Sequence, residues 1–176
     1  ANRLVTRTAK KADYQNLTSD KSESQYNMLR RLELNEAMHH ELIDYCAKRN
    51  IGFLSTGFDI KSIDLLVNLG QECFKIPSGE ITNLPYLRHI GQLGKKIILS
   101  TGMSNMSEIE AAIEILEQAG TSRTKVTILH CTSEYPAPMN EVNLLAMKSI
   151  HDEFGLAVGY SDHTVGIEVA IAAVAM

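Results

Sequence analysis

The chain of 176 residues has the length of one domain, and its 44% hydrophobic and 22% charged residues are typical of a soluble globular protein. Its formal net charge of −4 argues against a general nucleic-acid binder, because no basic field covers the chain. It shows no apolar run of membrane-spanning length and no signal peptide, so we expect a cytoplasmic protein with no membrane partner. Its three cysteines form no CxxC pair, so we expect them to be reduced thiols.

The first part of the chain, residues 1–34, is polar and weakly periodic. We interpret it as a long exposed connection with a short helix near residues 25–31. Asn35 is a typical N-cap residue, and the apolar spacing after it predicts a helix that ends near Asn50.

Five short apolar runs follow, and a helical pattern separates each run from the next. We expect strands at residues 52–55, around Lys75, and at residues 96–99, 125–129 and 156–159. Caps and stop signals predict helices between them, at residues 59–70, 83–94, 106–119 and 144–155. The final stretch, residues 166–176, is apolar nearly all round, which predicts a buried helix.

The spacing of these elements indicates the fold class. Strand starts recur about every 20–30 residues, the repeat of a βαβ unit, and continuous apolar strands are typical of a parallel sheet covered on both faces. No GxGxxG or GxxxxGK(S/T) motif follows a strand, which disfavours nucleotide-binding open sheets. We predict an α/β fold, a (β/α)8 TIM barrel of which the chain covers about five central βα units. Residues 1–34 are then a loop segment within the barrel, and residues 35–176 are its central part.

Polar residues follow the end of each expected strand, where α/β barrels build their active sites. Hydroxyls and backbone N–H groups that converge from several strands can hold a phosphate, although a turn or capping role explains any one of them alone. The five hydroxyl residues in matching positions are Thr56, Ser78, Ser100, Ser133 and Ser161.

Four further residues are candidates for chemistry. Lys75 can form a Schiff base or act as a fixed positive charge for a phosphate or carboxylate. Glu80 and Tyr135 flank the expected pocket and can hydrogen-bond a polyhydroxylated substrate or assist proton transfer. His163 is a metal ligand or a hydrogen-bonded structural histidine, because one histidine cannot make a metal site. For His130, which precedes the polar tip of its strand, we favour the structural interpretation.

Four motifs resemble those of the sialic acid (N-acetylneuraminate) synthase family, which includes legionaminic and pseudaminic acid synthases. They are KIPSGEITNLP at 75–85, ILSTGM at 98–103, LHCTSEYPAP at 129–138 and GYSDHT at 159–164. The resemblance implies a TIM barrel that condenses phosphoenolpyruvate with an N-acylated mannosamine-type sugar and releases phosphate by C–O cleavage. It also implies a divalent metal cofactor, typically Mn²⁺ and alternatively Mg²⁺ or Co²⁺, and a homodimeric full-length parent.

The resemblance also implies roles for individual residues. Glu80 and His163 match catalytic positions. Glu80 and Tyr135 match sugar contacts, and His163 matches one of two metal-binding histidines. The positions that match phosphoenolpyruvate contacts are Thr56, Lys75, Ser78, Ser100, Ser133 and Ser161.

Some features of the family are absent from the sequence. The first two strands, the eighth strand with the second metal histidine, and the small C-terminal antifreeze-like domain have no counterpart in it. We therefore expect this fragment alone to be inactive and its parent to be an active synthase. Gly57 stands where the family usually has proline, which we expect to loosen the loop after Thr56.

Two alternatives remain open at this level. One is a Schiff-base aldolase or lyase that uses Lys75, and the other is a non-catalytic sugar-phosphate-binding barrel fragment. Borohydride trapping of a lysine adduct is expected for the first, and ligand binding without turnover for the second. The motifs do not specify which nonulosonic acid a synthase of this kind would make.

Overall fold

The computed structural model describes residues 3–20 and 22–176, and the chain divides into two compact units, Ala1–Phe53 and Leu54–Met176. The first unit contains helices α1 (Asp13–Thr18), α2 (Gln25–Leu32) and α3 (Glu36–Lys48). The expected Asn35 cap is confirmed, since its Oδ1 accepts a hydrogen bond of 2.9 Å from the N–H of Met38.

The expectation that residues 1–34 form a connection with one short helix is wrong in part. The helix near residues 25–31 is present as α2, but α1 precedes it. Gln15 stabilises the start of α1 because its Oε1 accepts a hydrogen bond of 2.9 Å from the N–H of Ala12. A helix of six residues is too short to show a periodic apolar face, so the sequence pattern gave no sign of it.

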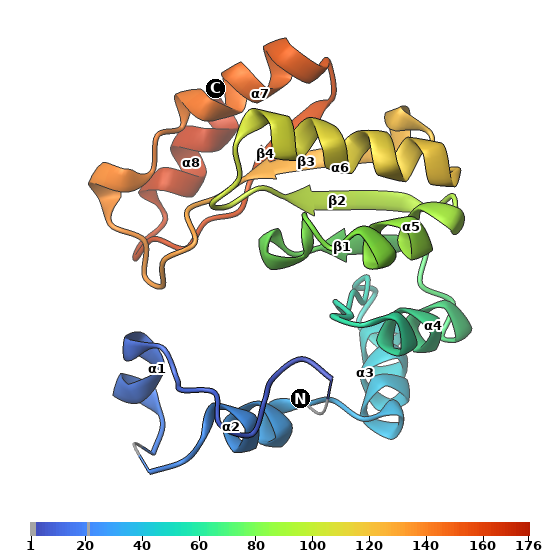
Figure 1. The fold of residues 1–176 in the computed structure, drawn as a ribbon, viewed down its shortest axis with the longest axis vertical. Coiled ribbons are helices and arrows are strands. Elements are labelled where there is room, and N and C mark those ends of the chain that lie inside the picture. Colours follow the sequence, from blue (N-terminus) through green and yellow to red (C-terminus); the bar gives the residue numbers. More distant parts are fainter. Residues whose placement is uncertain (1–2, 21) are drawn as a thin grey trace. The chain divides into compact units, whose positions relative to one another are not determined.

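The second unit is a parallel α/β layer (Figure 1). Its four strands pair in the order β1-β2-β3-β4, with bounds Cys73–Ile76, Lys96–Ser100, Val126–His130 and Ala157–Tyr160. The helices of this unit are α4 (Ile60–Asn68), α5 (Leu84–Gln92), α6 (Met106–Ala119), α7 (Leu145–Phe154) and α8 (Glu168–Ala175). Short 3₁₀ turns lie at Ser78–Glu80, Arg123–Lys125 and Met139–Glu141. The predicted alternation of parallel strands and helices is confirmed.

One of the five expected strands, the first in chain order at residues 52–55, does not pair with the sheet. Its Ser55 bonds instead with the side chain of Gln71, which accepts from the Ser55 N–H at 3.0 Å and donates to the Ser55 carbonyl at 3.0 Å. The side-chain amide thus satisfies the two backbone groups through which a strand would pair. Residues 51–57 therefore belong to no strand or helix, and the expectation of a strand here is wrong.

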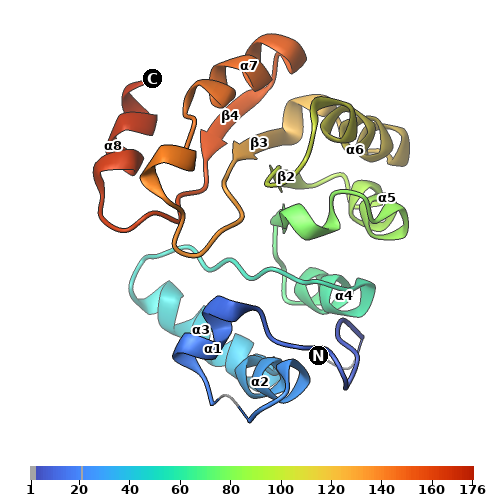
Figure 2. The same ribbon diagram turned by 60° about the vertical axis from the view of Figure 1, so that its left-hand side comes forward.

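The residues on the two faces of the sheet differ in how deeply they are buried. Alternate strand residues on one face are buried against the helices that line the outside of the strands in Figure 2. These core residues are Phe74, Ile76, Ile97, Leu99, Val126 and Ile128. The register places Lys75 beside Ile98 and Ile98 beside Thr127 on the opposite face, where all three are half-buried. Ser100 lies two residues after Ile98, so it shares this second face with Lys75.

The close packing of α5 against α6 depends on Gly91. A Cβ at this position would lie 2.6 Å from the Cβ of Ala119 and 3.0 Å from the Leu116 carbonyl oxygen. The Gly91 carbonyl also accepts a hydrogen bond of 2.8 Å from the buried Oγ1 of Thr121. The two helices can therefore approach only because this position has no side chain.

We expect Gly91→Ala to lower the free energy of unfolding by about 1–3 kcal/mol, because overpacking outweighs the gain in helix propensity. Thermal or urea unfolding monitored by circular dichroism measures this change. Gly79→Ala is the control, since a Cβ at Gly79 has no heavy atom within 4 Å. Equal stability of the two variants would contradict the packing account.

The final helix α8 is less buried than the apolar pattern predicts. Val169 and Ala173 are buried, and α8 packs against β4, but Ile171 and Val174 are exposed. The expectation of a helix buried all round is therefore wrong for this structure, because α8 contacts its neighbours along one side. Among residues 3–20 and 22–176, no helix is both long enough and apolar enough to cross a membrane.

Candidate functional site

Three loops meet at Gly102, which follows the end of β2. Its N–H donates a hydrogen bond of 2.8 Å to Ser78 Oγ in the loop after β1. A Cβ at Gly102 would lie 2.1 Å from Ser133 Oγ and 3.0 Å from Cys131 Sγ, both after β3. The hydroxyls of Ser78 and Ser133 therefore lie close around a backbone that can carry no side chain. We call the group Ser78, Gly102, Cys131 and Ser133 the Gly102 cradle.

Two more predicted residues, Lys75 and Ser100, lie on the second face of the same strands, opposite the core residues. Ser100 is only 2% exposed, and its Oγ is buried without a hydrogen-bond partner among the described residues. Such a group costs free energy unless a ligand or water satisfies it. Lys75 is half-buried on the same face, and within the described part of the chain no carboxylate pairs with it. An unpaired cation and an unsatisfied hydroxyl on one face suit an anionic ligand.

The segment that carries Thr56 is fixed by its neighbours. The Tyr86 hydroxyl donates a hydrogen bond of 2.6 Å to the Gly57 carbonyl, and burial raises the pKa of Tyr86 so that it stays a donor. A Cβ at Gly57 would lie 3.0 Å from Ile63 Cδ1. The expectation that Gly57 loosens this loop is therefore wrong, because its carbonyl is bonded and its α-carbon is tightly packed.

His163 forms a second cluster after β4. Its Nδ1 lies 2.8 Å from the Thr132 carbonyl oxygen, so Nδ1 donates the hydrogen bond and, in the neutral imidazole, Nε2 carries the lone pair. Nε2 is 3.5 Å from Ser161 Oγ, and the ring lies 4.3 Å from that of Tyr135, centroid to centroid. The Ala137 N–H donates to the His163 carbonyl at 2.8 Å and ties the two loops together.

This arrangement of His163 fits one ligand of a metal site. Metal-binding histidines are commonly oriented by a carbonyl on the other ring nitrogen, as Thr132 does here. However, the described residues contain no group of three His, Cys, Asp or Glu side chains that could hold an ion. A metal at His163 would therefore need further ligands.

The remaining predicted residues are placed less tightly. Glu80 Oε2 accepts a hydrogen bond of 2.6 Å from Asn83 Nδ2, which holds the carboxylate near the start of α5. No hydrogen bond among the described residues joins Glu80 or Thr56 to the other predicted site residues. The structure thus brings Ser78 close to Ser133. It also brings Ser161 and Tyr135 close to His163. Lys75 and Ser100 share one face of the sheet.

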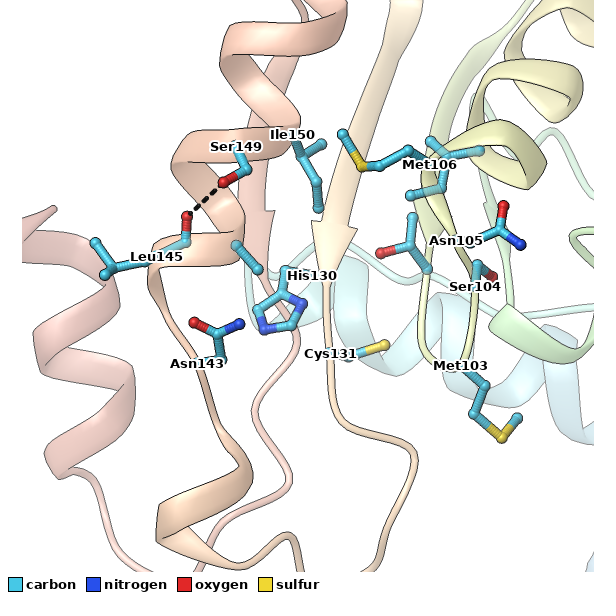
Figure 3. Close-up of a pocket in the computed structure, with 13 residues that line it drawn as sticks. Met103, Ser104, Asn105, Met106, His130, Cys131, Asn143, Leu145, Ser149 and Ile150 are labelled. Carbon is cyan, nitrogen blue, oxygen red and sulfur yellow. Dashed lines mark hydrogen bonds between the residues drawn. The ribbon is translucent and has the colours of Figure 1, made fainter.

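A cavity of about 450 Å³ lies elsewhere, between the β2–α6 loop and α7 (Figure 3). Its lining includes Met103, Met106, His130 and Leu145, but none of the predicted site residues. His130 Nε2 is 2.8 Å from the Val142 carbonyl oxygen, which agrees with the structural role that we favoured for it. The cavity is therefore not the predicted site, although Cys131 lies between the two.

The sequence interpretation missed three residues that shape the site: Gly102, Cys131 and Tyr86. Gly102 stands in a Ser-Thr-Gly stretch at a strand end, a pattern that could have marked a close backbone approach. Cys131 and Tyr86 gave no comparable signal, because a buried thiol and a helical tyrosine are typical of core residues.

Comparison with known proteins identifies the family. The sequence model of the NeuB family matches residues 1–176. The chain belongs to the NeuB family. It is 57% identical over 176 residues to N,N'-diacetyllegionaminic acid synthase of Campylobacter jejuni, an alignment that covers 100% of this chain and 53% of the relative. The enzyme of the same name from Legionella pneumophila is 48% identical over 178 residues, which cover 100% of this chain and 50% of the relative.

A solved structure confirms the fold class. The crystal structure of N-acetylneuraminic acid (sialic acid) synthetase from Leptospira borgpetersenii in complex with citrate superposes with a TM-score of 0.82 at 32% identity. It covers 92% of this NeuB-family chain and 55% of the Leptospira chain. The predicted α/β fold of the TIM-barrel type is confirmed, with four paired strands in place of the expected five. The chain spans about half the length of the curated relatives that it matches.

Proposed function

We propose that the protein is a nonulosonic acid synthase that condenses phosphoenolpyruvate with an N-acylated amino sugar and releases phosphate. The observation that carries this proposal is the Gly102 cradle, in which hydroxyls from the loops after β1 and β3 meet at the glycine after β2. Ser100 and Lys75, which have no hydrogen-bond or ion-pair partner among the described side chains, lie on one face of the same strands and support it. Relatives named as legionaminic acid synthases support the same reaction class.

The sugar that we propose carries two acetamido groups. The two relatives with 57% and 48% identity are both named N,N'-diacetyllegionaminic acid synthase. That name specifies acetyl groups on two nitrogen atoms of the product. Because phosphoenolpyruvate contains no nitrogen, both acetamido groups must come from the sugar. We expect Tyr135 and Glu80 to contact this sugar.

The residues of this chain act mainly by positioning. Lys75 and the hydroxyls of Thr56, Ser78, Ser100, Ser133 and Ser161 hold the phosphate and carboxylate of phosphoenolpyruvate. Two of these groups are held before the ligand arrives, since Ser78 is bonded to Gly102 and Ser100 is buried. Preorganised donors stabilise developing charge without a cost of reorganisation during the reaction. The enol carbon of phosphoenolpyruvate forms the new C–C bond with the sugar aldehyde, and water adds to the resulting cationic carbon that bears the phosphate. Phosphate then leaves with the bridging oxygen by C–O cleavage, and the oxygen of the water stays on that carbon as the keto oxygen.

A divalent cation, typically Mn²⁺, would supply Lewis-acid polarisation of the sugar aldehyde when bound. His163 Nε2 would hold it, because the Thr132 carbonyl fixes the proton on Nδ1 and leaves the Nε2 lone pair free for coordination. The ring of Tyr135 lies beside the imidazole, 4.3 Å between centroids and tilted by 38°. In the whole protein, which we expect to be a homodimer, other residues would complete the coordination.

The test of the proposed function is a phosphate-release assay with the full-length protein. The assay contains phosphoenolpyruvate, Mn²⁺ and a panel of acetamido sugars with one or two acetamido groups. We expect the fastest release with a diacetamido sugar, and ¹⁸O in the bridging position should appear in the phosphate. Release of unlabelled phosphate, or of none, would contradict the proposal.

One alternative rests on Lys75, whose unpaired position also suits a Schiff-base aldolase or lyase. In that case borohydride with the substrate would trap a covalent adduct at Lys75, and a chelator would leave activity unchanged. A synthase gives no adduct and loses activity in chelator. Binding of phosphoenolpyruvate without turnover by the full-length protein would favour the non-catalytic alternative.

We expect His163→Gln to lower the turnover of the full-length enzyme at least about 100-fold, because it removes the imidazole nitrogen that the Thr132 carbonyl orients for coordination. Phosphoenolpyruvate binding should change by less than about threefold, since Ser161 is the one proposed phosphoenolpyruvate contact whose hydroxyl lies beside His163 among the described residues, 3.5 Å from Nε2. Mn²⁺ affinity, measured by electron paramagnetic resonance, should fall in parallel with turnover. His40→Gln, on an exposed helix position, is the control. Unchanged Mn²⁺ affinity in the His163 variant would exclude this ligand role.

A further inference from the structure

The buried thiol of Cys131 lies directly against the Gly102 cradle. Its Sγ is 3.3 Å from Ser78 Oγ, a hydrogen-bonding distance for sulfur, and the residue is only 6% exposed. In Figure 3, Cys131 and its neighbour His130 point to opposite sides of β3, and the sulfur points toward the β2–α6 loop. The thiol therefore lies against Ser78 in the cradle and also lines the cavity beside α6 and α7.

The contact with Cys131 uses part of the limited hydrogen-bonding capacity of the Ser78 hydroxyl. A serine hydroxyl has one proton to donate and can accept two hydrogen bonds. The Gly102 N–H already donates to Ser78 Oγ at 2.8 Å. If the Cys131 S–H also donates, both acceptor sites are filled and the single Ser78 proton must point elsewhere. An anionic phosphate oxygen is a much stronger acceptor than a thiol, so a bound phosphate attracts this proton.

We infer that Cys131 is a positioning residue, whose thiol together with the Gly102 N–H holds the Ser78 hydroxyl so that its proton is donated to the phosphate of the substrate. The inference rests on the proposed function, because it assumes that the cradle binds phosphoenolpyruvate. Cys131 itself does not touch the ligand. Its contribution is to fix the direction in which Ser78 donates.

Steric packing alone makes a different prediction, which allows a test. A residue that only fills space is replaced well by one of similar size, whereas a hydrogen-bonding residue is replaced well by another donor. Cys131→Val fills the site without a donor, Cys131→Ser keeps a donor in a smaller side chain, and Cys131→Ala removes both. The full-length protein carrying each variant is titrated with phosphoenolpyruvate by calorimetry, and thermal unfolding checks that each variant is folded.

We expect Cys131→Ala and Cys131→Val to raise the dissociation constant for phosphoenolpyruvate about three- to tenfold, the effect of losing one weak hydrogen bond. Cys131→Ser should stay within about twofold of the wild type. In steady-state assays, KM for phosphoenolpyruvate should rise while KM for the sugar stays unchanged. Wild-type affinity in Cys131→Val would overturn the inference, and if Cys131→Ala does not fold, the comparison of the valine and serine variants decides.

A double-mutant cycle with Ser78→Ala completes the test. If Cys131 acts through Ser78, adding Cys131→Ala to Ser78→Ala should change the dissociation constant less than about twofold. Multiplication of the two single effects would overturn the inference, because it would show that Cys131 acts independently of Ser78. A wild-type protein that binds no phosphoenolpyruvate would overturn the proposed function itself. A wild type that binds it as tightly as every Cys131 variant would overturn this inference alone.

Discussion

Gly102→Ala is expected to weaken phosphoenolpyruvate binding by at least about 100-fold. The added methyl group would lie 2.1 Å from Ser133 Oγ, 3.0 Å from Cys131 Sγ and 3.1 Å from Ser78 Oγ, so all three side chains must move. Displacement of the hydroxyls removes several phosphate contacts at once, and each is worth about 1.5–3 kcal/mol when the partner is charged. Calorimetric titration of the full-length protein with phosphoenolpyruvate measures the loss.

The control for this variant is Gly52→Ala, because a Cβ at Gly52 meets no heavy atom within 4 Å. This variant should bind phosphoenolpyruvate within about twofold of the wild type. Gly102→Ala should also lower the free energy of unfolding by about 1–3 kcal/mol, as overpacking does elsewhere. If Gly102→Ala binds as tightly as Gly52→Ala, the cradle is not the phosphate site.

Lys75→Met is expected to lower kcat/KM for phosphoenolpyruvate by about 100- to 1000-fold. Lys75 is half-buried beside Ile98, and methionine preserves the length and the apolar stem of the side chain. What is lost is the charge, which in a partly desolvated site interacts with an anion more strongly than it would in water. Steady-state kinetics of phosphate release measures the effect.

Lys96→Met is the matched control, since it removes the same charge from the same face of the sheet. Lys96 opens β2 and is exposed, so it lies at the opposite end of the strand from Ser100. We expect its kcat/KM to stay within about threefold of the wild type at moderate ionic strength. Equal losses in both variants would mean that long-range charge, and not local contact, determines the affinity.

The fold was predictable wherever local signals were strong. The helix after Asn105 has a capping box and a glycine stop at Gly120, and its predicted bounds are confirmed. The prediction that residues 52–55 pair with a neighbouring strand was wrong, because the side chain of Gln71 bonds the backbone of Ser55 instead. Gln71 lies 16 residues away from Ser55, and no local pattern reports that its amide replaces a neighbouring strand.

The sequence predicted which strand ends carry the residues of the candidate site. It did not predict how these residues contact one another. The parallel topology carries polar residues after successive strands to one edge, which explains why Ser78 and Ser133 meet. The sequence did not indicate that Gly102 lies between Ser78 and Ser133, or that the Cys131 thiol lies against Ser78. Those features depend on distances of a few ångströms between different loops, which spacing along one strand cannot specify.

The most direct test of the account is a crystal structure of the full-length protein with phosphoenolpyruvate. We predict phosphate oxygens within hydrogen-bonding distance of Ser78 Oγ and Lys75 Nζ, and a partner for the Ser100 hydroxyl. A phosphate bound in the cavity between α6 and α7 (Figure 3), with Ser78 and Lys75 unliganded, would contradict it.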